Sequence, residues 1–381
     1  MRNIMKIASL LLASAVMFIS CDKDGGDDTS MDARFQVTSD KNVIQSNGED
    51  FVTFSAFLDG KDVTAQTVFY LKDGDSMTPL DGNKLSADKA GVYNVIGSYG
   101  TFYTEDPVSV TAINVPVPAA AEDSDASNTS FVHRSFLQQY TGTGCGYCPG
   151  MIRALRAAFE DEETKNMTVH AAIHSYNAGD PAYIASPRAD GNSYPQAKID
   201  NAVKFSYADD PYAKTGVLKK IVSQRTSVPA KVGISANPLY NDGVLVVTVE
   251  VKAAQAGDYN LGVWFLQDNV DGQQTDYLGI ADASYNKHEN CVRVADSRYG
   301  SSFAGYPIGT LKAGETVTRT FALDLNEVVD KIGTVRKELW KLKKMEDLHF
   351  AAFVTEKNGK NYQVLNVIDC PIDQPTPYQY K

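Results

Sequence analysis

A strand, a helix and a second strand follow one another in the middle of the chain. The first strand is predicted at 135–142 (SFLQQYTG), the helix at 145–162 and the second strand at 166–176 (NMTVHAAIHSY). Apolar residues recur at helical spacing within the predicted helix, at Ile152, Leu155, Ala158 and Phe159. This order of elements indicates a parallel βαβ unit, so the middle of the chain is predicted to have an α/β fold.

Two cysteines lie at the start of the predicted helix, in the sequence TGTGCGYCPGM. We expect Cys145 at the helix N-terminus, where unpaired amides and the helix dipole favour a thiolate. A thiolate there can attack a substrate disulfide, and Cys148, one turn further along, can resolve the mixed disulfide. Pro149 falls early in the helix, where a missing N–H costs little. The pair is a redox site, half of a zinc site, or a disulfide that only holds the scaffold together.

A zinc site needs two ligands besides the cysteine pair. His170 and His174 have a suitable H-x3-H spacing. They lie in the predicted strand, however, where side chains four residues apart are about 13 Å from each other. We therefore expect no metal, and no cofactor, at the cysteine pair. His174 stays a candidate site residue because it lies at the end of the strand, where βαβ folds place their sites.

The sequences YTGTGCGYCP and YPQAKIDN together look like parts of a thioredoxin-like domain. The first is similar to that of the Omp-twenty-eight-type outer-membrane lipoproteins of Bacteroidetes, in which a lipid-anchored thioredoxin-like domain precedes a β-sandwich. The resemblance covers about residues 131–372. It implies that Cys145 is the nucleophile, that Cys148 resolves, and that Pro195, after a cis bond, guides the substrate strand. Further candidates for the lining of this site are Gly146, Tyr147, Gln139, His174 and Tyr194.

Two positions depart from the thioredoxin pattern. Gln139 stands six positions before Cys145, where thioredoxins keep a buried carboxylate that relays protons for the resolving cysteine. An amide cannot titrate. Gly144 stands directly before Cys145, where thioredoxins usually have Trp, so an apolar surface for substrate docking is missing. Both changes argue against an efficient general reductase.

The N-terminus has the features of a bacterial lipoprotein signal. Two basic residues precede an apolar stretch of 13 residues at 7–19 (IASLLLASAVMFI), which is short for a membrane span and typical of a signal peptide. The stretch ends in FISC, which resembles a lipobox. Residues 1–20 are thus predicted to be removed, and Cys21 to be acylated and held in outer-membrane lipid. The alternative is an ordinary signal peptide that is cut after ASA at 13–15.

The rest of the chain is predicted to be rich in β-strands. Short alternating segments with Gly and Asp turns predict an Ig-like β-sandwich before the α/β unit and a second sandwich after it. The second sandwich contains a predicted helical insertion at 326–344 and ends in a hairpin that turns at Asn358 and Gly359. The predicted fold class is a multidomain α/β plus all-β protein. Its predicted parts are the signal peptide (1–20), a tether (21–33), the Ig-like sandwich (34–115), a linker (116–130), the thioredoxin-like domain (131–229), the C-terminal sandwich (230–372) and a tail (373–381).

Charge and cysteine content limit the partners. The chain has 381 residues and a formal net charge of −11, so we expect no nucleic-acid partner. After Cys21 goes to lipid, four cysteines remain, an even number in an oxidising envelope. Cys291 and Cys370 are predicted either to form a disulfide within the last sandwich or to be buried and free.

Two functions from different classes agree with these observations. The first is thiol–disulfide exchange on envelope or surface proteins, with the protein anchored by lipid to either face of the outer membrane. The second is a non-catalytic binding, adhesion or assembly lipoprotein, in which the cysteine pair is a structural disulfide.

Overall fold

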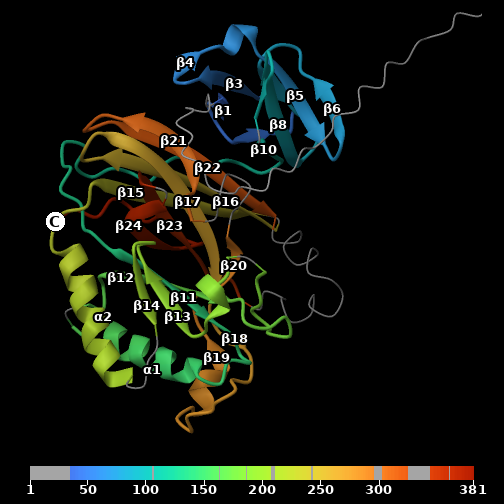
Figure 1. Ribbon diagram of the computed structural model, residues 1–381. Helices are drawn as coiled ribbons and strands as arrows, with labels where there is room; N and C mark the ends of the chain where they lie inside the picture. The colour runs from blue at the N-terminus through green and yellow to red at the C-terminus, as the bar shows by residue number, and fades with distance from the viewer. Residues whose placement is uncertain are drawn as a thin grey trace, which may run out of the picture.

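The computed structural model describes residues 35–104, 107–162, 164–185, 187–206, 211–241, 243–295, 303–324, 344–359 and 361–381. The predicted signal peptide, Cys21 and the tether lie outside these residues, as does the helix predicted at 326–344 except for Lys344. Within the described residues the protein is mostly β-strand, with several sheets and two α-helices (Figure 1). Neither of these two helices is long and apolar enough to cross a membrane.

Two sheets enclose one core in the N-terminal part. One contains β1 (Phe35–Ser39), β3 (Phe51–Leu58), β4 (Lys61–Asp62) and β7 (Lys84–Ser86). The other contains β2 (Val43–Gln45), β5 (Val68–Asp73), β6 (Ser76–Pro79), β8 (Gly91–Tyr99), β9 (Phe102–Tyr103) and β10 (Val108–Ile113). Phe54 of the first sheet and Phe69 of the second are buried, and their rings stack 5.9 Å apart. The prediction that this segment is all-β is confirmed.

The middle part contains β11 (Ser135–Thr141), α1 (Cys148–Phe159), β12 (Thr168–His174), β13 (Gln196–Ile199), β14 (Val203–Ser206) and α2 (Pro211–Thr226). Its strands lie in the order β14–β13–β11–β12. β11 and β12 run parallel on either side of α1 in the chain, so the predicted βαβ unit is confirmed. β13 pairs antiparallel with both β11 and β14. The two helices lie together at the end of the molecule away from the N-terminal sheets (Figure 1).

The helices cover one face of this sheet. Leu155 of α1 and Leu218 of α2 are buried in one cluster with Leu137 of β11. Phe136, the neighbour of Leu137, points to the opposite face because side chains alternate along a strand. There its ring lies 5.1 Å from that of Trp264, in the C-terminal part of the chain. The middle part therefore has a core on each side of its sheet.

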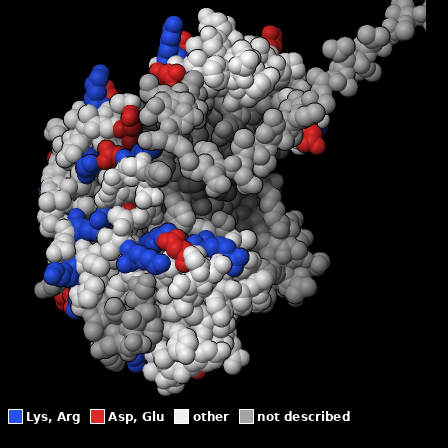
Figure 2. All heavy atoms as spheres, viewed as in Figure 1, with Lys and Arg blue, Asp and Glu red and all other residues white. Residues whose placement is uncertain are grey.

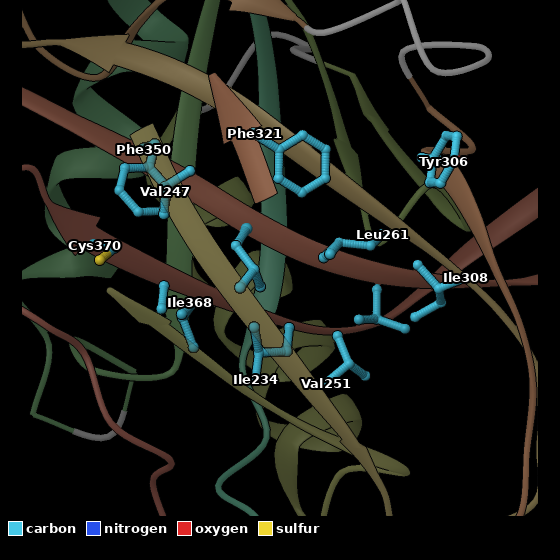
Figure 3. Packing of buried hydrophobic residues seen from close by; sticks show 14 of the residues in the cluster. Ile234, Val247, Val251, Leu261, Tyr306, Ile308, Phe321, Phe350, Ile368 and Cys370 are labelled. Atoms are coloured by element: carbon cyan, nitrogen blue, oxygen red, sulfur yellow. The ribbon is translucent and has the colours of Figure 1, made fainter. Parts of the chain in front are cut away.

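The C-terminal part contributes β15 (Val232–Asn241), β16 (Val244–Ala253), β17 (Gly257–Gln267), β20 (Cys291–Ala295), β21 (Tyr306–Leu311), β22 (Thr316–Asp324), β23 (Leu348–Asn358) and β24 (Asn361–Pro371). β15, β16 and β22 form a three-stranded sheet. The others extend the middle sheet in the order β12–β20–β17–β23–β24, with β21 beside β17. Ile234, Val247 and Phe350 lie in the core between the two sheets (Figure 3). A single sheet thus continues from the α/β unit into the C-terminal part.

Short elements complete the fold. β18 (Val270–Asp271) and β19 (Lys287–His288) pair as a small ribbon between β17 and β20. Four 3-10 helices lie at Thr64–Gln66 (η1), Asp190–Asn192 (η2), Ala283–Asn286 (η3) and Met345–Asp347 (η4). The predicted C-terminal hairpin is confirmed, because Asn358 pairs with Asn361 across a turn in which Gly359 has a φ of 62°.

The disulfide suggested between Cys291 and Cys370 is wrong, and the alternative of two buried free cysteines holds. Cys291 lies on β20 and Cys370 on β24, and β17 and β23 run between those strands. Three strand spacings amount to about 14 Å, whereas disulfide formation requires Cα atoms within about 7 Å. Counting cysteines could not reveal this separation.

The predicted linker and tail are both fastened to the C-terminal part. Lys252 of β16 forms an ion pair with Asp123 of the linker at 2.7 Å. Tyr380 of the tail donates a hydrogen bond to the same carboxylate at 2.6 Å. Thr376 exchanges two backbone hydrogen bonds with Ala236 of β15. These contacts join the two segments to the three-stranded sheet.

Ion pairs of the middle part differ in burial. On the face shown in Figure 2, several Lys and Arg side chains lie next to acidic side chains. Lys198 and Asp190 form a pair at 2.8 Å in which the Asp190 side chain is 54% exposed. Asp200 is fully buried, accepts the Phe136 N–H at 2.6 Å and pairs with Arg225 of α2. Burial raises the pKa of Asp200, and Arg225 partly offsets that rise. Asp200 therefore links the start of β11 to α2.

Replacing Asp200 by Ala should lower the free energy of unfolding by about 3 kcal/mol, because Arg225 and the Phe136 N–H lose a buried partner. The matched control is Asp190→Ala, for which we expect a loss of about 0–1 kcal/mol. Urea unfolding of both variants provides the measurement. Equal losses would show that Asp200 does not hold the helix to the sheet.

Candidate functional site

The Cys145–Cys148 disulfide lies between the end of β11 and the start of α1. The helix begins at Cys148, one turn later than predicted, so Cys145 precedes it. The reason is a turn in which the Cys148 N–H donates to the Cys145 carbonyl at 3.1 Å. Pro149 occupies the first helical turn, as predicted. Cys145 still lies within one turn of the unpaired N–H groups, where the helix dipole favours negative charge.

Residues 272–281, which we call the cover segment, lie over this disulfide. The Gln274 side-chain amide donates to the carbonyl oxygens of Thr143 at 3.3 Å and Cys145 at 3.1 Å. Cys145 is only 3% exposed, and Cys148 is fully buried. A protein thiol therefore cannot reach either sulfur while these contacts hold.

Tyr277 of the cover segment explains why residue 146 is glycine. The Tyr277 N–H donates to the Gly146 carbonyl at 2.8 Å. A Cβ atom added to Gly146 would lie 2.4 Å from the Tyr277 ring, closer than real contacts allow. The Tyr147 ring meets the Tyr277 ring edge-on at 5.5 Å, and the Tyr147 residue is 53% exposed. Gly146 and Tyr147, the two residues between the cysteines, thus both contact the cover segment.

Gly144 is fixed by a polar contact. Its N–H donates to the Asn177 side-chain oxygen at 3.1 Å. A Cβ atom at Gly144 would lie 2.9 Å from the same oxygen. Gly144, which stands where thioredoxins usually have Trp, therefore leaves room for Asn177 beside the loop that carries the two cysteines.

Gln139 belongs to a short chain of hydrogen bonds. Asn290 Nδ2 lies 3.3 Å from His170 Nδ1, and His170 Nε2 lies 3.0 Å from Gln139 Oε1. An amide nitrogen donates, so Nδ1 accepts and the Nε2–H donates to Gln139. Burial lowers the pKa of His170 to about 4, which keeps this ring neutral. Neither Gln139 nor His170 is therefore a ready proton acceptor near neutral pH.

His174 joins two buried groups at the end of β12. Its Nδ1 lies 2.9 Å from Asp180 Oδ2, and its Nε2 lies 3.7 Å from Cys291 Sγ. Burial lowers the pKa of His174, but its electrostatic interactions and hydrogen bonds with Cys291 and Asp180 outweigh that effect and raise the pKa to about 10. Asp180 also accepts the Thr143 N–H at 2.6 Å. The cluster Cys291–His174–Asp180 is thus tied to the loop that carries the disulfide.

The Tyr194–Pro195 peptide bond is cis, as predicted. Tyr194 shares a hydrogen bond with the Ser175 hydroxyl at 3.0 Å, and its ring meets Tyr176 edge-on at 5.2 Å. Pro195 directly precedes β13, which pairs with β11. The role of Pro195 in guiding a substrate strand stays a prediction.

A cavity of about 270 Å³ lies between α1 and the strands β11 and β12. Leu155 and Phe159 of the helix line it together with His170, His174 and His288. Burial is the main cause that lowers the pKa of His288 to about 4, and its ring meets that of His174 edge-on at 4.9 Å. The cavity is thus largely apolar, with imidazoles from two sequence-distant segments on its wall.

Several residues of this region were not predicted from the sequence. They are Asp180, Gln274, Tyr277 and His288. Asp180 follows His174 by six residues in an irregular loop, and the other three belong to the ribbon and cover segment between β17 and β20. Among the residues described, no group of three or more His, Cys, Asp or Glu side chains is arranged to hold a metal ion.

Comparisons with known proteins assign no family. No family model and no curated protein matches the chain. Among solved structures, HBP35 of Porphyromonas gingivalis is 17% identical over 66% of this chain and 78% of its own, with a TM-score of 0.46. A DUF3823 family protein from Bacteroides ovatus is 8% identical over 81% of this chain and 90% of its own, with a TM-score of 0.20. Both sources are Bacteroidetes. At such TM-scores neither likeness bears on the fold or function.

Removing the Tyr277 ring should expose the disulfide. In Tyr277→Ala the Cys145–Cys148 bond should be reduced several-fold faster by dithiothreitol than in the wild type, because access limits attack on a buried sulfur. Alkylation at timed intervals followed by mass spectrometry measures the rate. Tyr103→Ala removes another exposed aromatic ring, in the N-terminal part, and should leave the rate unchanged. Identical rates in all three proteins would mean that Tyr277 does not shield the bond.

Proposed function

We propose that this protein is a lipid-anchored protein of the cell envelope that exchanges disulfides with other envelope proteins through Cys145 and Cys148. The observation that carries this proposal is a disulfide between two cysteines in the turn that leads from β11 into α1, which begins at Cys148. Unpaired N–H groups at a helix start stabilise a thiolate, and a thiolate is the species that attacks disulfides.

The surrounding topology supports a thioredoxin-like interpretation of this unit. A parallel βαβ unit is followed by an antiparallel strand pair and a second helix that packs on the same face as the first. This agrees with the domain that the sequence resemblance implies. The resemblance also underlies the proposed roles of the residues, with Pro195 beside the path of the substrate.

The exchange proceeds in two steps. In the reduced protein the Cys145 thiolate attacks one sulfur of a substrate disulfide, so that a mixed disulfide forms and a substrate thiolate leaves. The Cys148 thiol then loses its proton and attacks Cys145, which restores the Cys145–Cys148 bond and releases the reduced substrate. Gln139 cannot accept that proton, so we propose that solvent admitted by displacement of the cover segment accepts it.

Burial of the disulfide favours a second candidate, a structural disulfide in a non-catalytic binding or assembly lipoprotein. Gln274 and Tyr277 close over the bond in its oxidised form. A bond that only staples the scaffold would have a reduction potential below about −300 mV. Exchange requires instead that a partner displaces the cover segment.

Two matched variants separate the candidates. In Cys148→Ser, which keeps only the proposed nucleophile, reaction with oxidised insulin should yield a stable mixed disulfide at Cys145. Cys145→Ser should yield none, although it also retains one cysteine of the pair. Mass spectrometry detects the adduct, and redox titration of the wild type gives the potential. No adduct with either variant, together with a potential below about −300 mV, would support the staple.

The proposed lipid anchor has a separate test. The mature protein, isolated from membranes, should begin at Cys21 and carry diacylglycerol on its sulfur. Cys21→Ser should abolish this modification, whereas Ser20→Ala keeps a small residue before the cysteine and should preserve it. Mass spectrometry of the N-terminal peptide makes the measurement. An unmodified mature N-terminus after Ala15 would favour the ordinary signal peptide.

A further inference from the structure

Cys291, His174 and Asp180 form a chain from sulfur to imidazole to carboxylate. The Cys291 sulfur and His174 Nε2 are 3.7 Å apart, and His174 Nδ1 and Asp180 Oδ2 are 2.9 Å apart. The carboxylate is itself fixed by the N–H groups of Thr143 at 2.6 Å and Ala182 at 2.8 Å. A thiol next to an imidazole that a third group orients is the arrangement that activates a nucleophile. The proposed disulfide exchange uses none of these three side chains.

The other free cysteine has different surroundings. Cys370 accepts a hydrogen bond from the Thr376 hydroxyl at 3.1 Å, and its sulfur lies 3.5 Å from the Pro371 carbonyl oxygen and 4.0 Å from that of Gln374. Burial raises the pKa of Cys370 to about 12, so this thiol stays protonated. Cys291 and Cys370 are both fully buried. They form a natural pair for comparison, because among the described residues an imidazole contacts the sulfur of Cys291 and none contacts that of Cys370.

Access decides which reagent can reach Cys291. Its sulfur has no exposed surface, so a protein thiol or a protein disulfide cannot approach it. Ala172, which pairs with Cys291 across β12 and β20, and Asn290, which precedes it, both line the cavity beside α1. His174 lines the same cavity and contacts the sulfur. An electrophile that reaches the buried Cys291 from this side must therefore be small, of a few atoms.

We propose that Cys291 is a site of oxidation by small hydroperoxides, with His174 as its proton partner and Asp180 as the residue that positions His174. His174, held protonated by Asp180, stabilises the thiolate of Cys291, and this thiolate attacks the terminal oxygen of the peroxide. The S–O bond forms as the O–O bond breaks, and the leaving oxygen takes the proton from His174. The sulfur is oxidised to sulfenic acid, and the hydroperoxide is reduced to water or an alcohol.

Hydrogen peroxide is the probe, applied to the full chain with Cys145–Cys148 oxidised. Dimedone traps sulfenic acids, and mass spectrometry compares the peptides of Cys291 and Cys370 in one sample. We expect Cys291 to be labelled at least about 100-fold faster than Cys370, the lower end of the gain from a positioned acid or base. Equal or slower labelling of Cys291 in the wild type would overturn the proposal without any variant.

Variants then test the assisting residues. His174→Gln should lower the labelling rate of Cys291 about 100-fold, and Asp180→Asn should lower it in the same direction, while that of Cys370 stays constant. Thr376→Val changes only the partner of Cys370 and should leave Cys291 unaffected. Unfolding of a variant would raise the labelling of both cysteines, so Cys370 reports on the fold within each sample. Undiminished labelling of Cys291 in folded His174→Gln would contradict a role for the imidazole. Disulfide exchange at Cys145 is measured separately, by the mixed disulfide with insulin. A failure of that exchange would leave the labelling result for Cys291 unchanged.

Discussion

The buried carboxylate of Asp180 joins the loop that carries the disulfide to the pair of His174 and Cys291. It accepts hydrogen bonds from the N–H groups of Thr143 and Ala182 and pairs with His174. Burial alone raises the pKa of a carboxyl group, but His174 and these N–H donors lower that of Asp180 to about 2. A buried charge is tolerated only when it is fully paired in this way. The Asp180 side chain thus fixes the loop that carries the disulfide and the end of β12. Through His174 it also fixes the position of the Cys291 thiol on β20.

This arrangement places the disulfide in a closed environment. The loop whose Thr143 N–H donates to Asp180 also accepts the Gln274 side-chain amide and lies against the Tyr277 ring. Tyr277 is nevertheless 68% exposed, because only part of its ring rests on Gly146. A contact of this kind can open locally at a cost below that of global unfolding. Burial of the sulfurs and exchange at Cys145 are therefore compatible, provided that a partner pulls the cover segment away.

Much of the fold could be predicted because its signals are local. The alternation in β3, the helical spacing of α1 and the Asn358–Gly359 turn each lie within a few residues. Helix α2 was not predicted, although Leu218, Ile221 and Val222 recur at helical spacing in its sequence and pack into the core. Contacts between residues that are far apart in the chain leave no pattern in the sequence from which they could be predicted. Gln274 reaches Cys145 across 129 positions, and nothing in the sequence near either residue indicates that contact.

The two free cysteines show that the order of strands in a sheet cannot be predicted from the sequence here. An even number of cysteines in a chain predicted to be exported left complete pairing open, but pairing depends on which strands are neighbours. The order β20–β17–β23–β24 keeps Cys291 and Cys370 apart, so each is left as a thiol in a core. Only one of the two meets an imidazole, because β12 ends at His174 beside the first residue of β20. The sheet that joins the α/β unit to the C-terminal part is therefore what makes one buried thiol chemically different from the other.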